Sequence, residues 1–197
     1  MASDPALVLL TAEEYRRASI ILEGVPGTAA HLDPRSLVPG MTYVAFATEL
    51  YFKFLFLRDK GKDAPNEHDL RKLFRMLRRD IQKRIKTKWE SPVAGVLIIR
   101  NPIAAATRKP HPDFDETLRL SANAFIRLRY AYQYPRSALN YIGGDIMECA
   151  RDVIYEDYPT EYAASRLPLP PGAINKSQIT GVVDKLDTHP LRQPPKK

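Results

Sequence analysis

The sequence predicts an all-α protein, an up-and-down bundle of four or five helices with an extended, proline-rich tail at the C-terminal end. Apolar side chains recur at helical spacing in five segments, and no long segment alternates with a period of two. Prolines and glycines mark the connections between these segments. The composition, with 44% hydrophobic and 27% charged residues, excludes a wholly disordered or collagen-like chain.

The first predicted helix spans residues 11–23 and is followed by a loop. Thr11 and Glu14 form a capping box, in which each side chain satisfies a free backbone N–H at the helix start. Prolines and glycines then crowd residues 24–40, a composition that is typical of a connecting loop.

The second predicted helix spans residues 41–60, is apolar nearly all round and ends at Gly61. An apolar surface this wide predicts a central helix, or a helix with a second partner. Phe52 and Phe56 lie on a different face from the main apolar stripe, and exposed aromatic pairs of this kind mark interfaces. We therefore expect a homodimer.

The third predicted helix, residues 69–88, has one apolar and one basic face. The apolar residues recur every three or four positions and predict a buried face: Leu70, Leu73, Phe74, Leu77, Ile81 and Ile85. Asn66 or Asp69 is expected to cap the start. His68 is expected to hydrogen-bond the free N–H groups there or to pack against the preceding helix. The candidate nucleic-acid contacts on the basic face are Arg71, Arg75, Arg78, Arg79, Lys83 and Lys86.

The positive charge of the chain is concentrated around this helix. There are 30 Lys or Arg and 23 Asp or Glu residues, a formal net charge of +7. Residues 53–88 hold 13 basic and 5 acidic residues, which leaves a net charge of −1 for the rest. Such asymmetry is the usual footprint of a polyanion partner, and a solvated helix face that keeps the protein soluble is the other explanation.

Two further helices are predicted after a segment rich in proline. Prolines exclude a long helix in residues 91–112, which leaves a short strand or a loop packed on the core. Helices are then expected over residues 114–134 and 137–155. The adjacent Gly143 and Gly144 predict a kink in the second of them.

The chain changes character at residue 159. The last 39 residues hold 7 of the 17 prolines, which predicts a helical domain over residues 1–158 and an extended tail over residues 159–197. No stretch is apolar enough for a membrane helix, and the N-terminal residues lack the features of a secretory signal. A single cysteine, Cys149, excludes an internal disulfide and is expected to be buried and inert. We expect a cytoplasmic protein.

No motif in the sequence indicates a catalytic activity. The chain contains no phosphate-binding glycine loop, no dinucleotide fingerprint and no nucleophile elbow. Its four histidines are too far apart in the sequence to pair at metal-ligand spacing. We therefore expect neither a cofactor nor a metal.

Three segments occur together in a familiar order. Residues 49–53 read Glu-Leu-Tyr-Phe-Lys, His68-Asp69-Leu70 opens the next helix, and residues 125–132 follow later. In order and spacing, over roughly residues 41–155, they resemble the HEPN superfamily (higher eukaryotes and prokaryotes nucleotide-binding). The resemblance implies an all-α bundle, often dimeric, in a superfamily rich in ribonucleases, toxin–antitoxin components and phage-defence factors.

The sequence departs from the ribonucleases of that superfamily at one decisive position. Those enzymes carry an Arg, four to six further residues and a His, the Arg for the phosphate and the His as general acid or base. Here Arg129 matches the Arg, but Tyr134 stands where a His would fall. A phenol holds its proton too tightly near neutral pH to replace an imidazole. The resemblance therefore implies a non-catalytic member that acts by binding, as a homodimer or with a partner protein.

Two alternatives stay open. One is a module that binds RNA or DNA through the basic face, and the other is a divergent, metal-independent ribonuclease built around Arg129 and Tyr134. On a helical wheel Arg129 falls on the apolar stripe of its helix, where a charge needs a partner. Glu49, one of two charges inside the most apolar helix, is the expected partner in a buried bridge. The other interpretation of Arg129 is a relic of the phosphate-binding arginine, exposed at a dimer cleft.

Overall fold

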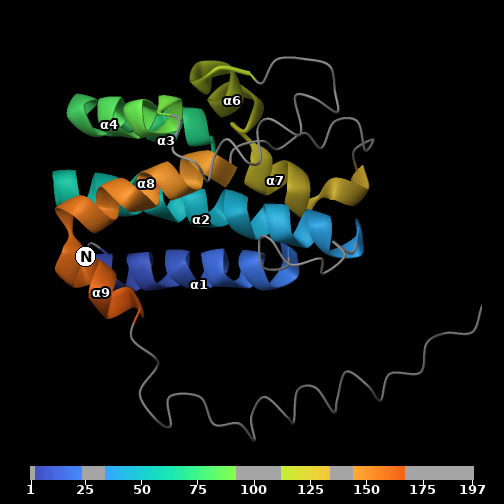
Figure 1. Ribbon diagram of the computed structural model, residues 1–197, viewed down its shortest axis with the longest axis horizontal. Helices are drawn as coiled ribbons and strands as arrows, with labels where there is room; N and C mark the ends of the chain where they lie inside the picture. Colours follow the sequence, from blue (N-terminus) through green and yellow to red (C-terminus); the bar gives the residue numbers. More distant parts are fainter. Residues whose placement is uncertain (1–2, 24–33, 92–111, 134–143, 167–197) are drawn as a thin grey trace, which may run out of the picture. The chain divides into compact units, whose positions relative to one another are not determined.

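The computed structural model describes residues 3–23, 34–91, 112–133 and 144–166. Within these ranges every regular element is helical, so the all-α class predicted from the sequence is confirmed. Figure 1 labels the α-helices, which span Pro5–Glu23 (α1), Pro34–Lys60 (α2), Leu70–Met76 (α3), Arg79–Glu90 (α4), Phe114–Leu120 (α6), Ala124–Arg129 (α7), Gly144–Asp157 (α8) and Pro159–Arg166 (α9); a 3-10 turn (η1) follows at Ala131–Gln133. None of the described helices has the length and apolar character needed to cross a membrane.

Helix α2 is central, as its apolar surface predicts, and contacts α1, α3, α7 and α8. Phe52 and Phe56 are both buried, and the Phe52 ring lies 5.7 Å from that of Phe74 on α3. Because the chain buries both rings itself, the exposed aromatic pair from which we expected a homodimer is not present, and the homodimer stays a prediction without that support. Gly61 ends α2 as predicted, with a φ of +64° and its N–H donated to the Leu57 carbonyl at 2.8 Å.

Helices α1 and α2 lie side by side (Figure 1), and both begin earlier than predicted. Asp4 caps α1, accepting the N–H of Ala6 at 2.9 Å. Thr11 lies inside the helix and donates its hydroxyl to the Leu7 carbonyl at 2.8 Å, so the expected capping box is wrong. Helix α2 starts at Pro34 and contains Pro39. The last residues of the loop predicted over residues 24–40 are therefore helical.

The predicted helix over residues 69–88 is two helices, α3 and α4. The backbone is extended at the Leu77 and Arg78 caps, with ψ of 157° and 141°, and the Gln82 amide donates to the free Leu77 carbonyl at 2.7 Å. All six apolar residues predicted for the buried face are buried. Asp69 caps α3 as predicted, accepting the backbone N–H groups of Arg71 and Lys72 at 2.8 and 3.1 Å.

The predicted helix over residues 114–134 is also interrupted. A turn separates α6 from α7, and there the Ala122 carbonyl accepts the N–H of Leu70 at 2.7 Å. Phe114 holds α6 to the bundle, since its ring lies 5.2 Å from Phe74 and 5.6 Å from Trp89. Residues 92–111, for which the sequence leaves a strand or a loop open, lie outside the described residues.

The C-terminal part of the bundle consists of α8 and α9. Helix α8 begins at Gly144, and the kink predicted at Gly143 lies outside the described residues. Cys149 is buried, as predicted. Helix α9 packs on α1 and α8 and occupies Pro159–Arg166, the start of the segment predicted to be an extended tail. Part of the predicted tail is therefore a helix that packs on the bundle, while residues 167–197 lie outside the described residues.

Candidate functional site

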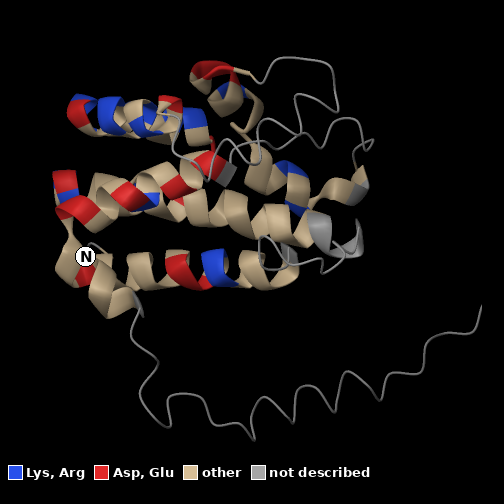
Figure 2. Ribbon diagram, in the orientation of Figure 1, with Lys and Arg blue, Asp and Glu red and all other residues tan. Residues whose placement is uncertain are grey.

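The basic residues of α3 and α4 divide into those that are paired and those that are not. Residues 70–90 contain nine Lys or Arg and two Asp or Glu. Figure 2 shows this blue concentration on α3 and α4, with red on α8 and at the start of α6. The acidic residues of these neighbouring helices decide which cations keep an uncompensated charge.

On the side facing α8, the cations of α4 are neutralised. Arg84 donates to both carboxylate oxygens of Asp157, at 2.8 and 2.7 Å, and to Glu156 at 2.8 Å. Lys88 donates to the other oxygen of Glu156 at 2.6 Å. These pairs hold α4 against α8 and leave no charge there for a ligand.

Three further cations have close acidic partners. Two are candidate nucleic-acid contacts: Arg78 binds Asp80 through two hydrogen bonds of 2.6 and 2.8 Å, and Lys86 donates to Asp115 on α6 at 2.7 Å. Lys72 lies 2.9 Å from Glu67. Its ammonium and the backbone N–H groups of residues 69 and 68 lower the pKa of the Glu67 carboxyl to about 2.

The remaining four cations form what we call the basic stripe: Arg71, Arg75, Arg79 and Lys83. They are spaced four residues apart in the sequence, two on α3 and two on α4. Arg75, Arg79 and Lys83 are exposed and Arg71 is half-buried. Among the described residues none of the four has an acidic partner within ion-pair distance, in contrast to the other five cations of α3 and α4.

The predicted Glu49–Arg129 bridge is wrong. Glu49 is fully buried, but its Oε1 accepts from Lys53 Nζ at 2.7 Å, and its two oxygens lie 3.0 and 3.1 Å from His68 Nδ1. His68 thus contacts the preceding helix, one of the two roles expected for it, and ties the start of α3 to α2. Arg129 is exposed, with its guanidinium over the Tyr130 ring at 5.5 Å.

The divergent ribonuclease centre proposed from the sequence stays a prediction, because one of its two residues is not described. Arg129 lies at the exposed end of α7, and Tyr134 lies outside the described residues. His68, the one histidine described, is committed through Nδ1 to Glu49. Within the described residues, no group of His, Cys, Asp or Glu side chains is clustered as a metal site requires.

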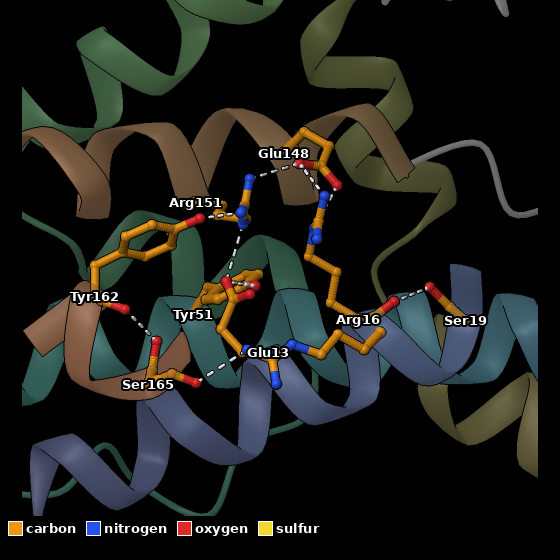
Figure 3. Close-up of polar contacts among 9 residues, drawn as sticks. Glu13, Arg16, Ser19, Tyr51, Glu148, Arg151, Tyr162 and Ser165 are labelled. Atoms are coloured by element: carbon orange, nitrogen blue, oxygen red, sulfur yellow. Dashed lines mark hydrogen bonds and ion pairs between the residues drawn. The ribbon is translucent and has the colours of Figure 1, made fainter. Parts of the chain in front are cut away.

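A buried polar network joins α1, α2, α8 and α9 (Figure 3). Glu13, 1% exposed, accepts from the Tyr51 hydroxyl at 2.7 Å and from Arg151 Nε at 2.9 Å. Arg151 also contacts Glu148 at 3.5 Å and the Tyr162 hydroxyl. Burial, with the nearby Glu13 carboxylate, raises the pKa of the Tyr51 hydroxyl above its ordinary value, so that this group stays a donor.

The same network includes a second arginine and is electrically balanced. Arg16 binds Glu148 through two hydrogen bonds of 2.7 and 3.2 Å, so two arginines face two carboxylates. The side chains of Arg16 and Glu148 are 18% and 37% exposed, so water reaches this end of the network. Because its contacts join four helices, the network stabilises the bundle.

Comparisons with protein-family models, with curated proteins and with solved structures find no match for this chain. The HEPN resemblance therefore rests on the three sequence segments described above. The basic stripe is the strongest candidate site, because it is the one group of charged side chains on α3 and α4 that the described chain leaves uncompensated.

Proposed function

We propose that this protein is a non-catalytic, HEPN-like helical protein that acts by binding, and that its ligand is a nucleic acid held through its phosphates by the basic stripe. The observation that carries the proposal is the separation of the nine cations in residues 70–90 into five with an acidic partner and four with none among the described residues. Each helix carries two of these like charges four residues apart, and the extended residues Leu77 and Arg78 separate the two pairs. The HEPN resemblance adds a toxin–antitoxin or defence setting as the proposed context.

Electrostatics favours a polyanion at this surface. Like charges four residues apart on a helix destabilise it by about 0.2–0.5 kcal/mol per pair, and a bound phosphate removes that repulsion. Lys and Arg contacts to phosphates release counterions and supply most of the sequence-independent affinity for nucleic acids. We therefore propose binding without strong sequence preference, weakening as salt rises.

Removing two stripe charges is expected to weaken RNA binding about tenfold, because each exposed charge pair contributes up to about 1 kcal/mol. The variant is Arg75→Gln with Arg79→Gln, and the measurement is fluorescence anisotropy of a labelled oligoadenylate at about 50 mM salt. The matched control is Lys62→Gln with Arg127→Gln, which removes two exposed charges outside the stripe. Equal losses for the two double variants, or no binding by the wild type, would contradict the proposal.

We expect no ribonuclease activity, because no histidine follows Arg129 at the required spacing. Purified protein incubated with single-stranded RNA in EDTA should leave the RNA intact on a denaturing gel. The Arg129→Ala variant serves as the control for a contaminating nuclease. Cleavage by the wild type that Arg129→Ala abolishes would establish the ribonuclease alternative instead.

A further inference from the structure

The outer face of α1 exposes large apolar side chains. Ile21 is 80% exposed and Leu7 is 60% exposed, and Leu10 between them is half-buried. Other residues of the helix pack on α2 and α9. Among the described residues the other large hydrophobic side chains that are exposed are two tyrosines, so the exposed aliphatic ones are both on α1. Apolar side chains gathered on one exposed helix face indicate an interaction surface.

The exposed positions of α1 follow a heptad. Along this face, which we call the outer seam, the residues succeed one another at intervals of three, four, three and four positions: Leu7, Leu10, Glu14, Arg17 and Ile21. This is the spacing of the positions that bring two helices together in a coiled coil. The fully buried residues of α1 fall at other positions. Helix α1 therefore has one contact face inside the bundle and a second one on its outside.

Two opposite charges stand at the centre of the outer seam. Glu14 and Arg17 are both exposed, and within the described residues neither forms an ion pair. Arg17 donates to the Ser165 carbonyl at 3.2 Å, a contact that leaves its charge uncompensated. A helix that covers the outer seam must therefore present apolar residues at both ends and one charge of each sign at the centre.

Helix α1 of a second copy has this pattern, provided that it runs in the opposite direction. When Glu14 lies against Arg17 of the partner subunit, twofold symmetry sets the same pair a second time. The same register places Leu10 against Ile21 of the partner subunit at both ends of the contact. In a parallel arrangement Glu14 would face a glutamate and Arg17 an arginine, and this repulsion excludes the parallel pairing.

We propose that two copies of this protein associate through the outer seams of their α1 helices, antiparallel, with two Glu14–Arg17 pairs between two apolar layers. The HEPN resemblance implies only that such proteins are often dimeric, and it specifies no face, direction or register. The inference goes beyond the proposed function and does not depend on it. Helices α3 and α4, which carry the basic stripe, lie on the other side of α2 from α1 (Figure 1), so both surfaces can be occupied together.

Charge reversal tests the orientation and the register together. Glu14→Arg gives the seam two guanidinium groups and Arg17→Glu gives it two carboxylates, so each variant alone places like charges opposite one another. Each should raise the dimer dissociation constant at least about tenfold, as measured by sedimentation velocity up to about 100 μM protein. An equimolar mixture of the two variants should again form a dimer, with one chain of each, because opposite charges then face one another.

Ile21→Ser tests the apolar layers and should also weaken the dimer about tenfold. Its matched control is Tyr155→Ser, which removes a side chain that is 58% exposed on α8 and should leave the dimer unchanged. Thermal melting of every variant checks that the fold is retained. A monomeric wild type, a dimer that both charge reversals leave intact, or a mixture of the two variants that stays monomeric would overturn the inference.

Discussion

Replacing Arg151 by alanine is expected to lower the free energy of unfolding by about 3–5 kcal/mol. The substitution leaves the Glu13 carboxylate, 1% exposed, with the Tyr51 hydroxyl as its remaining donor in the network. It also removes the contacts of Arg151 to Glu148 and Tyr162. A buried charge without its counter-charge keeps the desolvation penalty and loses the attraction that offsets it. Urea denaturation followed by circular dichroism measures the effect.

The matched control for this prediction is Arg119→Ala. Arg119 also forms a two-bonded pair with a glutamate, Glu116, but 55% of its side chain is exposed. Exposed pairs one helical turn apart contribute at most about 0.5 kcal/mol. If both substitutions lower the unfolding free energy equally, the Glu13–Arg151 pair is not the buried link that the structure shows.

Replacing His68 by alanine is expected to lower the unfolding free energy by about 1–3 kcal/mol, whereas Arg129→Ala should change it by less than about 0.5 kcal/mol. His68→Ala removes one of the two polar partners of the fully buried Glu49 and loosens the start of α3. Lys53 remains on the carboxylate, so the effect is smaller than for Arg151. Thermal and urea denaturation of the two variants, side by side, make the comparison.

The opposite order of effects, with Arg129→Ala the more damaging, would restore the bridge predicted from the sequence. That bridge failed for a geometric reason. The helical wheel treats residues 114–134 as one continuous helix, but the turn between α6 and α7 changes the register after Leu120. Arg129 therefore points to solvent although continuous helical spacing places it on the apolar stripe.

In residues 69–88 the apolar periodicity was sufficient to predict the buried face, but not the helix ends. The apolar residues from Leu70 to Ile85 are placed correctly, because α3 and α4 both bury them. The backbone nevertheless breaks at Leu77 and Arg78, and no proline or glycine in the sequence indicates this break. Helix α9 was not predicted, because we interpreted Pro159 as the start of a tail. In the structure Pro159 occupies the first position of the helix, where proline is well tolerated.

The pairing of charges could not be predicted from the sequence. Arg84 and Asp157 are 73 residues apart, and Arg151 and Glu13 are 138 apart, so only the folded bundle brings them together. Sequence reasoning therefore grouped Arg78 and Lys86 with the unpaired cations, and it missed the buried network entirely. A charged residue such as Glu13 beside the apolar positions of an amphipathic helix was the one available signal for that network.

The most direct test of the central claim is the salt dependence of binding to single-stranded RNA. When the logarithm of the association constant is plotted against the logarithm of the salt concentration, each phosphate contact to a single strand contributes about −0.7 to the slope. Four stripe cations predict a slope near −3 for the wild type, falling to about −1.5 in Arg75→Gln with Arg79→Gln. A wild-type slope near zero, or a slope that the double variant leaves unchanged, would contradict the account.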